Sequence, residues 1–382
     1  MEALPGAFLR VTVANFFFFL NFASFFLLPL YLEALGADRS TVGAIMGTQG
    51  LAALCFLPVV AAWIDRLGRR GFLLCGSGGM ALAAALFPSI DHVSPLLFAL
   101  RILQGISFAS AFTATTTYAA ELAPIARRAR ALGIFGLSTL LTHSIAPGLG
   151  EEIIHRAGFP TLFYAASFCT LIAILVAARL PHGRVERAHE TSAGSGVGLS
   201  RMHWVIAVTT VLVGMGFGTV ITFVAAYVHS EGLGRAGFFF GAYTTAAILV
   251  RIVGAGLSDT FGRRRVIVPT MLVFGMAILW LSTVQSVLFL MLAGMLFGSA
   301  QGINYPTMHA YLVDLSHETN MGRAQALFNG SFNLGVTVSS FLFGVVAEHF
   351  GYRPMFALAA LMPMVGCALF YLLTVERSPG RG

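Results

Sequence analysis

The sequence predicts an all-α polytopic membrane protein, with twelve transmembrane helices arranged as two pseudo-symmetric six-helix bundles. Three observations predict this fold: an apolar composition, a series of long apolar runs, and an internal repeat. Of the 382 residues, 57% are hydrophobic and only 10% are charged, whereas a soluble domain carries roughly 25% charged residues. A set of soluble domains is therefore excluded, because the chain has too few polar residues to cover their surfaces.

The apolar runs are long enough to cross a bilayer, which takes about 20 mostly apolar residues in a helix. They do not alternate apolar with polar residues, as the strands of a membrane barrel do. The first run is not a cleavable signal, because its apolar stretch exceeds the usual length of roughly 7–15 residues. The predicted spans are residues 8–35, 41–63, 72–90, 95–120, 131–156, 160–180, 203–229, 236–257, 266–284, 287–313, 324–349 and 354–375.

The arginines predict that both termini lie in the cytoplasm. With the N-terminus placed there, seventeen arginines fall in cytoplasmic segments and four in outer loops, as the positive-inside rule requires. This topology also accounts for the net charge of +7, so we predict no nucleic-acid partner. The expected location is the cytoplasmic (inner) membrane, which the chain crosses many times.

The polar segment between the sixth and seventh spans is the one plausible linker, since it is rich in Gly, Ser, Arg and Glu. It predicts an N-terminal six-helix bundle at residues 1–180, a cytoplasmic linker at 181–202 and a C-terminal six-helix bundle at 203–382.

The composition also excludes several kinds of chemistry. The chain has no Lys, so it contains neither a P-loop for ATP nor a Schiff-base lysine. The four Cys lie inside apolar runs without zinc or redox spacing, which indicates buried hydrophobic side chains. His143, His155 and His309 include no pair four residues apart on one helix face. We therefore predict no cofactor and no metal.

An internal repeat relates the two halves. DRLGRR at residues 65–70 recurs as DTFGRR at residues 259–264, an offset of 194. Glu121 matches Asp314, and Gly158 matches Gly351, each at an offset of 193. These landmarks occupy equivalent places in the topology, so chance alignment is improbable. Two like-oriented halves form a known transporter plan, with the substrate site near the bilayer midplane between them.

The same residues carry a family resemblance over the whole chain. The loop DRLGRR and its weaker copy resemble the signature loop of the major facilitator superfamily. Arg101, Gln104 and Gly105 are similar to an R-x-x-Q-G motif of its proton-coupled members, and the PGLG sequence at residues 147–150 is similar to the Gly-Pro motif of its exporters. The resemblance implies a twelve-helix secondary transporter, most like the proton-coupled efflux branch, and functional as a monomer among membrane lipids.

Charges at the ends of spans form a predicted gating network. Asp65 and Arg69 lie four residues apart at the cytoplasmic mouth, with Glu121 at the end of the fourth span. We expect these charges to close the cytoplasmic side and to separate when the halves move. The network comprises Asp65, Arg66, Gly68, Arg69, Arg70 and Glu121, with Asp259, Gly262, Arg263 and Asp314 in the second half.

Ionisable groups inside the spans are candidates for proton coupling, because a charge at the bilayer centre costs at least ~2.5–3.5 kcal/mol. Arg101 on the fourth span and Glu151 and Glu152 on the fifth lie at similar depths. A contact between Arg101 and one of these carboxylates is therefore feasible. In this hypothesis the carboxylate alternates between a protonated and a paired state. The opposing interpretation is a packing ion pair with solvated carboxylates.

Other polar residues in the spans are candidates for the cavity lining. Arg251 either binds an anionic substrate or extends to the cytoplasmic surface. Asparagines in spans also hydrogen-bond between helices, so contact with substrate is the less frequent role of each. The remaining candidates are Asn21, Gln49, Tyr243, Asn304, Asn329 and Asn333, and the predicted hinge residues are Gly105, Pro147 and Gly150.

The functional prediction is a secondary active transporter that moves a small organic solute by alternating access, with proton-coupled export. One alternative is an importer of an anionic metabolite with the same fold, in which Arg101 and Arg251 bind carboxylates. A remote alternative is a polytopic membrane enzyme, which the short loops and the repeat disfavour. We therefore predict that the chain is not an enzyme, and that its partners are a small-molecule substrate and protons.

Overall fold

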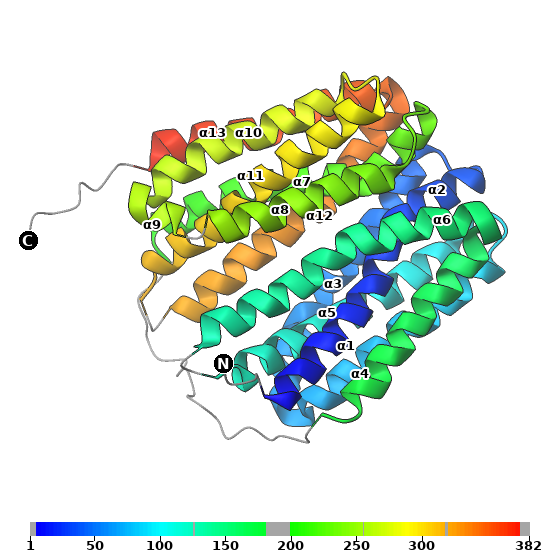
Figure 1. The fold of residues 1–382 in the computed structure, drawn as a ribbon, viewed down its shortest axis with the longest axis horizontal. Coiled ribbons are helices and arrows are strands. Elements are labelled where there is room, and N and C mark those ends of the chain that lie inside the picture. Colours follow the sequence, from blue (N-terminus) through cyan, green and yellow to red (C-terminus); the bar gives the residue numbers. More distant parts are fainter. Residues whose placement is uncertain (1–4, 125–126, 181–198, 255, 318–319, 375–382) are drawn as a thin grey trace, which may run out of the picture. The chain divides into compact units, whose positions relative to one another are not determined.

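The structure is a computed structural model, and the part of the chain that it describes is helical, with short turns between the helices (Figure 1). That part comprises residues 5–124, 127–180, 199–254, 256–317 and 320–374, without the side chains of residues 65–67 and 129. The chain divides into two compact units. The first comprises Met1–Glu186 with Ala225–Gly241, and the second comprises Arg187–Val224 with Ala242–Gly382.

The first unit begins with three consecutive segments, α1, the short 3₁₀ helix η1 and α2, which together form the first span. Its central packing is between α1 and α6, while α5 lies against α3 and α4. The helices of this part are α1 (Gly6–Ser24), η1 (Phe25–Leu27), α2 (Leu28–Ala34), α3 (Arg39–Leu67), α4 (Arg69–Leu86), η2 (Phe87–Ser89), α5 (Pro95–Leu122) and α6 (Arg128–Ala177).

The second unit is built around α10, which packs against α11 and α13. The end of α7 and the beginning of α8 belong to the first unit, so both helices run through the boundary between the units. The helices of this part are α7 (Arg201–Ser230), α8 (Ala236–Val253), α9 (Leu257–Phe261), α10 (Arg263–Leu281), α11 (Val287–Asp314), α12 (Met321–Phe350) and α13 (Tyr352–Leu373).

The predicted twelve spans are present. Eleven helical segments of the described chain are long and apolar enough to cross a membrane, and α6 contains two spans. Its interior is non-helical at Gly158, where φ is 80° and ψ is 172°, a conformation that glycine adopts without steric cost. Beyond this bend the second arm of α6 runs back, and α1 lies between the two arms in this view (Figure 1). The predicted linker lies largely outside the described residues, and the predicted division into two bundles stays a prediction.

The internal repeat extends to backbone dihedral angles. Gly68 has φ 85° and ψ 139°, and its equivalent Gly262 has φ 89° and ψ 140°. Gly158 is matched by Gly351, with φ 86° and ψ 171°. A positive φ between two helices requires glycine in each case. The two halves therefore share turn geometry as well as sequence landmarks.

Glycine also sets the closest helix approaches at repeat-equivalent places. A Cβ atom added to Gly105 of α5 would lie 2.3 Å from the backbone oxygen of Gln49 in α3. A Cβ atom added to Gly298 of α11 would lie 2.1 Å from the backbone oxygen of Tyr243 in α8. Small residues at such crossings allow helix backbones to pack directly in a membrane.

The repeat fails at one place. In the first unit α3 continues unbroken to Leu67, whereas the equivalent helix of the second unit ends at Val253 and resumes as α9 at Leu257. Gly254 and Gly256 flank this break, and Gly256 has a φ of +86°. The predicted eighth span, residues 236–257, is therefore shorter than expected, because the glycines permit a turn where the first unit has Val60 and Ala62.

The close approach at Gly105 predicts a loss of stability on substitution. Gly105→Val forces α5 away from α3 and should lower the free energy of unfolding by about 1–3 kcal/mol, the usual cost of overpacking. Gly133→Ala is the matched control, since no atom lies within 4 Å of the added Cβ. This control should be neutral or stabilising. Thermal unfolding of the purified chain in detergent measures both, and equal melting temperatures would contradict the assignment.

Candidate functional site

The loop between α3 and α4 contains the first set of predicted gating residues. Arg69 at the start of α4 forms an ion pair with Glu121 in the last turn of α5. Arg70 donates to the backbone oxygen of Ala178, at 2.5 Å, beyond the end of α6. The side chains of Asp65 and Arg66 lie outside the described residues. The loop is thus tied to two other helices of its unit, and its role as a gate stays a prediction.

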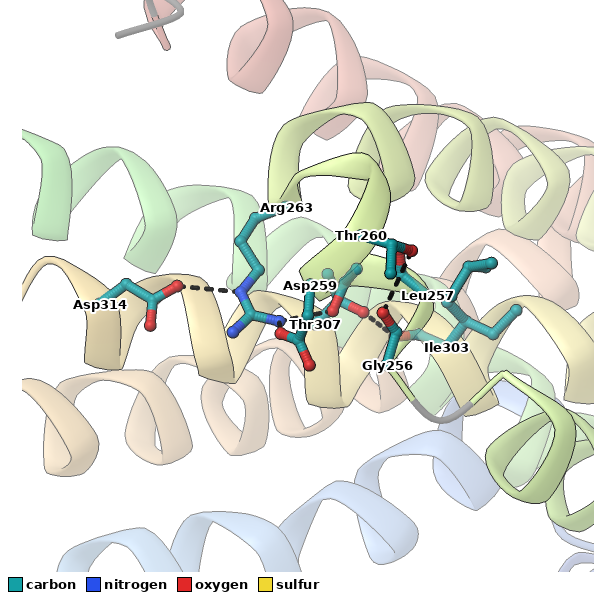
Figure 2. A network of polar contacts seen from close by, with 9 residues as sticks. Gly256, Leu257, Asp259, Thr260, Arg263, Ile303, Thr307 and Asp314 are labelled. Atoms are coloured by element: carbon teal, nitrogen blue, oxygen red, sulfur yellow. Dashed lines mark hydrogen bonds and ion pairs between the residues drawn. The ribbon is translucent and has the colours of Figure 1, made fainter. Parts of the chain in front are cut away.

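The second set lies between α9, α10 and α11. Figure 2 shows Arg263 extending between Asp314 of α11 and Asp259 of α9. Its Nε lies 2.9 Å from the Asp314 carboxylate, and its guanidinium also donates to the Ser258 hydroxyl at 2.6 Å. Asp259 and Asp314 are at least half exposed. Ion pairs of this exposure contribute only ~0–1 kcal/mol each, so their separation costs little.

The predicted residues Arg101, Gln104 and Gln49 come together in the packing of α5 against α3. Arg101 is buried, with an exposed fraction of 2%. Its guanidinium donates to the Gln104 and Gln49 side-chain oxygens at 2.8 and 2.7 Å, and to two backbone oxygens of α3 at 3.2 Å. Neutral oxygens therefore surround this charge, and no carboxylate pairs with it among the described residues.

Glu151 binds the first turn of α8. Its two carboxylate oxygens accept from the backbone N–H groups of Ala236 and Gly237, at 2.8 and 2.7 Å. These N–H groups have no partner within their own helix, and the N-terminus of a helix carries a partial positive charge that favours an anion. Gly148 of α6 lies close to Gly237, with only 3.0 Å from its Cα to a Cβ added there. The glycines therefore allow the carboxylate to reach the helix end.

The neighbouring Glu152 has a different environment. It forms an ion pair with Arg156 one turn later in α6 and another with Arg235, at 2.6 Å, just before α8. Both arginines are largely exposed. Glu152 therefore belongs to a surface ion-pair cluster, whereas Glu151 is directed at a helix end.

The contact between Arg101 and a carboxylate of the fifth span, which the sequence made feasible, is absent among the described residues. Arg101 uses its donors on α3 and Gln104, and Glu151 and Glu152 use their oxygens at the beginning of α8. Similar depth on consecutive helices does not fix direction, because a helix points its side chains around the full circle.

Several predicted lining residues have structural partners. Asn21 donates from α1 to the backbone oxygen of Ala166 in α6, and Asn304 donates from α11 to Thr270 in α10. Tyr243 is buried and packs against Phe217 and Phe297. These contacts match the interhelical role that asparagines and aromatic residues have in membrane bundles.

The remaining candidates lie around α11 and α12. Asn329 accepts from the Tyr305 hydroxyl at 3.1 Å, and Asn333 donates to the backbone oxygen of Asn329 at 2.8 Å. Arg251, in the last turn of α8, lines a cavity of about 460 Å³ that is formed with α9 and α11. Tyr305 lines the same cavity, so the structure brings these two residues together.

The predicted hinge residues are helical. Pro147 lies inside α6, where Gly158 has the non-helical dihedral angles. A Cβ atom on Gly150 would approach Leu27 to 2.7 Å, and Gly105 contacts α3. Both glycines therefore serve close packing in this structure, and the hinge assignment stays a prediction.

Sequence reasoning missed three features of the site. The first is the α8 N-terminus as the partner of Glu151, and the second is Ser258 as an acceptor for Arg263. The third is the helix break between α8 and α9. Only the break left a signal in the sequence, since Gly254 and Gly256 stand at the end of an apolar run, and paired glycines interrupt helices.

Comparison with known proteins identifies a family. A model of the Major Facilitator Superfamily matches residues 11–255 and, in a second match, residues 204–382. An uncharacterised MFS-type transporter of Methanocaldococcus jannaschii is 24% identical over 370 residues, covering 92% of this chain and 93% of the relative. An uncharacterised MFS-type transporter of Burkholderia pseudomallei is 26% identical over 365 residues, covering 89% of this chain and 85% of the relative.

Solved structures share the fold at low sequence identity. The nucleoside transporter NupG superimposes with a TM-score of 0.78 at 14% identity, over 97% of this chain and 100% of that chain. The human organic anion transporter MFSD10 (TETRAN) superimposes with a TM-score of 0.69 at 15% identity, over 96% and 99% of the two chains.

The environment of Arg101 predicts that a positive charge without the shape of the guanidinium does not satisfy the surrounding acceptor oxygens. Arg101→Lys keeps the charge, but an ammonium has three donors and cannot reproduce the planar fork that contacts Gln49, Gln104 and α3. We expect the free energy of unfolding to fall by about 1–3 kcal/mol, because buried acceptors lose their partner. Melting temperatures in detergent measure the change. The exposed Arg323→Lys is the control, and equal stability of the two variants would refute the prediction.

Proposed function

Because this chain belongs to the Major Facilitator Superfamily and is therefore a multi-pass membrane transporter of a small-molecule substrate, we propose that it exports a small organic solute in exchange for protons, by alternating access. Membership of a transporter family sets aside the remote alternative of a polytopic enzyme. One charge that moves through 100 mV supplies ~2.3 kcal/mol, equivalent to a solute gradient of roughly fifty-fold. One proton per cycle is therefore a sufficient driving force for export.

The observation that carries proton coupling is the contact of Glu151 with the first turn of α8. As a carboxylate, Glu151 accepts two backbone hydrogen bonds and interacts favourably with the positive end of the helix. As a neutral acid, it loses the charge and one of its oxygens becomes a donor. Protonation therefore weakens the attachment of α8 to α6, and deprotonation restores it.

Arg101 has a positioning role in this proposal. Neutral oxygens hold its guanidinium against α3 in this structure, so the proton is assigned to Glu151 and not to a carboxylate paired with Arg101. The ion pairs of Arg69 with Glu121 and of Arg263 with Asp314 are proposed to close one side of the membrane. Their exposure makes them inexpensive to separate, as a gate that opens in every cycle requires.

The arginine distribution supports the orientation of the proposal, with both termini in the cytoplasm. Seventeen arginines then lie on the cytoplasmic side and four on the outer side, and this bias sets the topology of bacterial-type membrane proteins. Export thus means movement from the side of the α3–α4 loop to the side of the α7–α8 turn.

The contact of Glu151 with the first turn of α8 predicts a pH-dependent exposure of backbone amides. When the pH falls and Glu151 becomes protonated, the amides of Ala236 and Gly237 lose the charge of their acceptor and one of its two accepting oxygens. They should then exchange with deuterium about tenfold faster, after correction for the intrinsic rate. Mass spectrometry of the peptide that spans the turn before α8 measures this exchange. In Glu151→Gln the exchange should be fast at every pH, with no acid-dependent step.

Glu152→Gln is the matched control, because it removes the adjacent carboxylate and leaves the contact with α8 intact. It should keep the acid-dependent step of the wild type. A step that persists in Glu151→Gln, or disappears only in Glu152→Gln, would assign the titration elsewhere and remove the basis of proton coupling through Glu151.

The direction of transport is tested in inverted membrane vesicles with an acidic interior, monitored with a pH-sensitive dye. Benzoate and uridine are the first probes, because the structural neighbours are described as transporters of organic anions and of nucleosides. For an exporter, a transported solute added outside these vesicles should dissipate the pH gradient in the wild type and not in Glu151→Gln. Solute entry into right-side-out vesicles that requires an inward proton gradient would instead establish the importer.

An importer of an anionic metabolite is the second candidate function. The cavity beside Arg251 favours it, since a cationic side chain there suits an anionic solute. The two candidates share the fold and differ only in the direction in which the solute crosses with respect to protons.

A further inference from the structure

The second unit contains a cavity of about 460 Å³ between α8, α9 and α11. This volume is within the range of roughly 300–1,000 Å³ that is usual for small-molecule sites. Its polar lining comprises Arg251, Ser258, Tyr305, Thr307 and His309. Figure 2 shows part of the wall, with Gly256, Leu257, Ile303 and Thr307 grouped beside the Arg263 network.

The cavity is cationic. Arg251 lines it, and none of the twelve lining residues is Asp or Glu. Asp259 of α9 and Asp314 at the end of α11 are both engaged by Arg263. An anion inside the cavity would therefore meet a positive charge without a competing carboxylate in the wall.

Among the described residues, two of the lining side chains have nitrogen atoms without a hydrogen-bond partner. Within the part of the chain that the structure describes, Arg251 makes no hydrogen bond or ion pair, and its Nε is buried without an acceptor. The His309 ring contacts Phe328, but neither ring nitrogen is hydrogen-bonded to the described protein. A buried N–H group without an acceptor is costly, and the Nε of Arg251 is such a group, so a ligand that accepts from Arg251 would bind favourably.

The hydroxyl of Ser258 adds a further donor. It accepts from Arg263 at 2.6 Å, so its own O–H is available to a ligand in the cavity. The same contact joins the cavity wall to the predicted gate, because Arg263 also holds Asp259 and Asp314. A ligand that binds Ser258 is thereby coupled to the ion pairs at the end of α11.

The cavity coincides with the place where the repeat fails. The first unit has an unbroken α3, but the second unit has the break between Val253 and Leu257, and Gly254 and Gly256 both line the cavity. Irregular backbone at membrane depth is tolerated where it borders protein or a cavity, and broken helices of transporters commonly form ligand sites. The break is therefore a local specialisation of this half.

We propose that this cavity binds the anionic group of a ligand, a carboxylate or a phosphate, through Arg251, with Ser258 and His309 as additional hydrogen-bonding groups. Where the ligand is the transported solute, this proposal rests on the transport function proposed above and assigns a negative charge to that solute. The same oxyanion chemistry is offered by a soluble organic anion and by the headgroup of an anionic phospholipid.

The test is equilibrium binding of radiolabelled benzoate to the purified full chain in phosphatidylcholine nanodiscs. Binding should be saturable and inorganic phosphate should compete. Arg251→Gln should weaken it at least about tenfold, and Arg251→Lys should retain part of it, since a charge remains. The exposed Arg323→Gln, which removes the same charge elsewhere, should bind as the wild type does.

A folding readout accompanies the binding. Arg251 has no protein acceptor to leave unsatisfied, so Arg251→Gln should melt at or above the wild-type temperature without benzoate. Benzoate should raise the melting temperature of the wild type and not of this variant. A fall in the melting temperature of the unliganded variant would show that Arg251 has a structural partner, and this outcome would overturn the proposal.

Nanodiscs that contain phosphatidylglycerol distinguish the two sources of the anion. Loss of benzoate binding in these nanodiscs identifies the lipid headgroup as the occupant, whereas unchanged binding identifies a soluble anion. Absence of saturable benzoate binding in phosphatidylcholine, or equal binding by Arg251→Gln, would overturn the proposal. These outcomes are independent of the acid-dependent exchange at Glu151, so failure of the anion site and failure of proton coupling are separable.

Discussion

The energetic cost of an unmatched charge inside the bilayer is the constraint on which the interpretation of this protein depends. Arg101, Glu151 and Arg251 lie within the spans, and each meets that cost differently. Arg101 is surrounded by neutral oxygens of α3 and α5. Glu151 is matched by the backbone N–H groups at the start of α8. Arg251 has no match among the described residues and borders a cavity.

These three solutions correspond to three roles. A charge that the protein satisfies fully stabilises one packing arrangement, as Arg101 does between two helices. A charge whose partner is a helix end responds to a single proton, because neutralisation removes the interaction with the helix dipole. A charge without a protein partner is available to a ligand. The degree to which the fold satisfies a buried charge therefore separates packing, coupling and binding groups of the same chemical type.

The duplicated architecture explains why the second unit differs from the first. Gly68 and Gly262 adopt the same dihedral angles, and Gly105 and Gly298 make equivalent close approaches. Against this conserved geometry the break at Gly254 and Gly256 is a local departure. It separates α9 from α8 and opens the wall beside Arg251, while Arg263 still connects α9 to α11. A departure from a repeat thus points to a specialised site.

The sequence by itself determined the membrane class, the spans, the repeat and the family resemblance. These properties depend on hydrophobic length, on the arginine bias and on spacing along the chain, all of which are local or additive quantities. It also indicated that Gln49, Gln104 and Arg101 were of interest, since polar residues in apolar runs are conspicuous.

Only the tertiary structure decided which partner each polar residue has. The rotation of a helix about its axis and the register between helices are set by side-chain packing and by close approaches at glycine, and neither is a function of sequence spacing alone. For this reason Glu151 points to the N–H groups of Ala236 and Gly237 and not to Arg101. For the same reason only the structure shows that Arg251 borders a cavity together with the broken segment at Gly254 and Gly256.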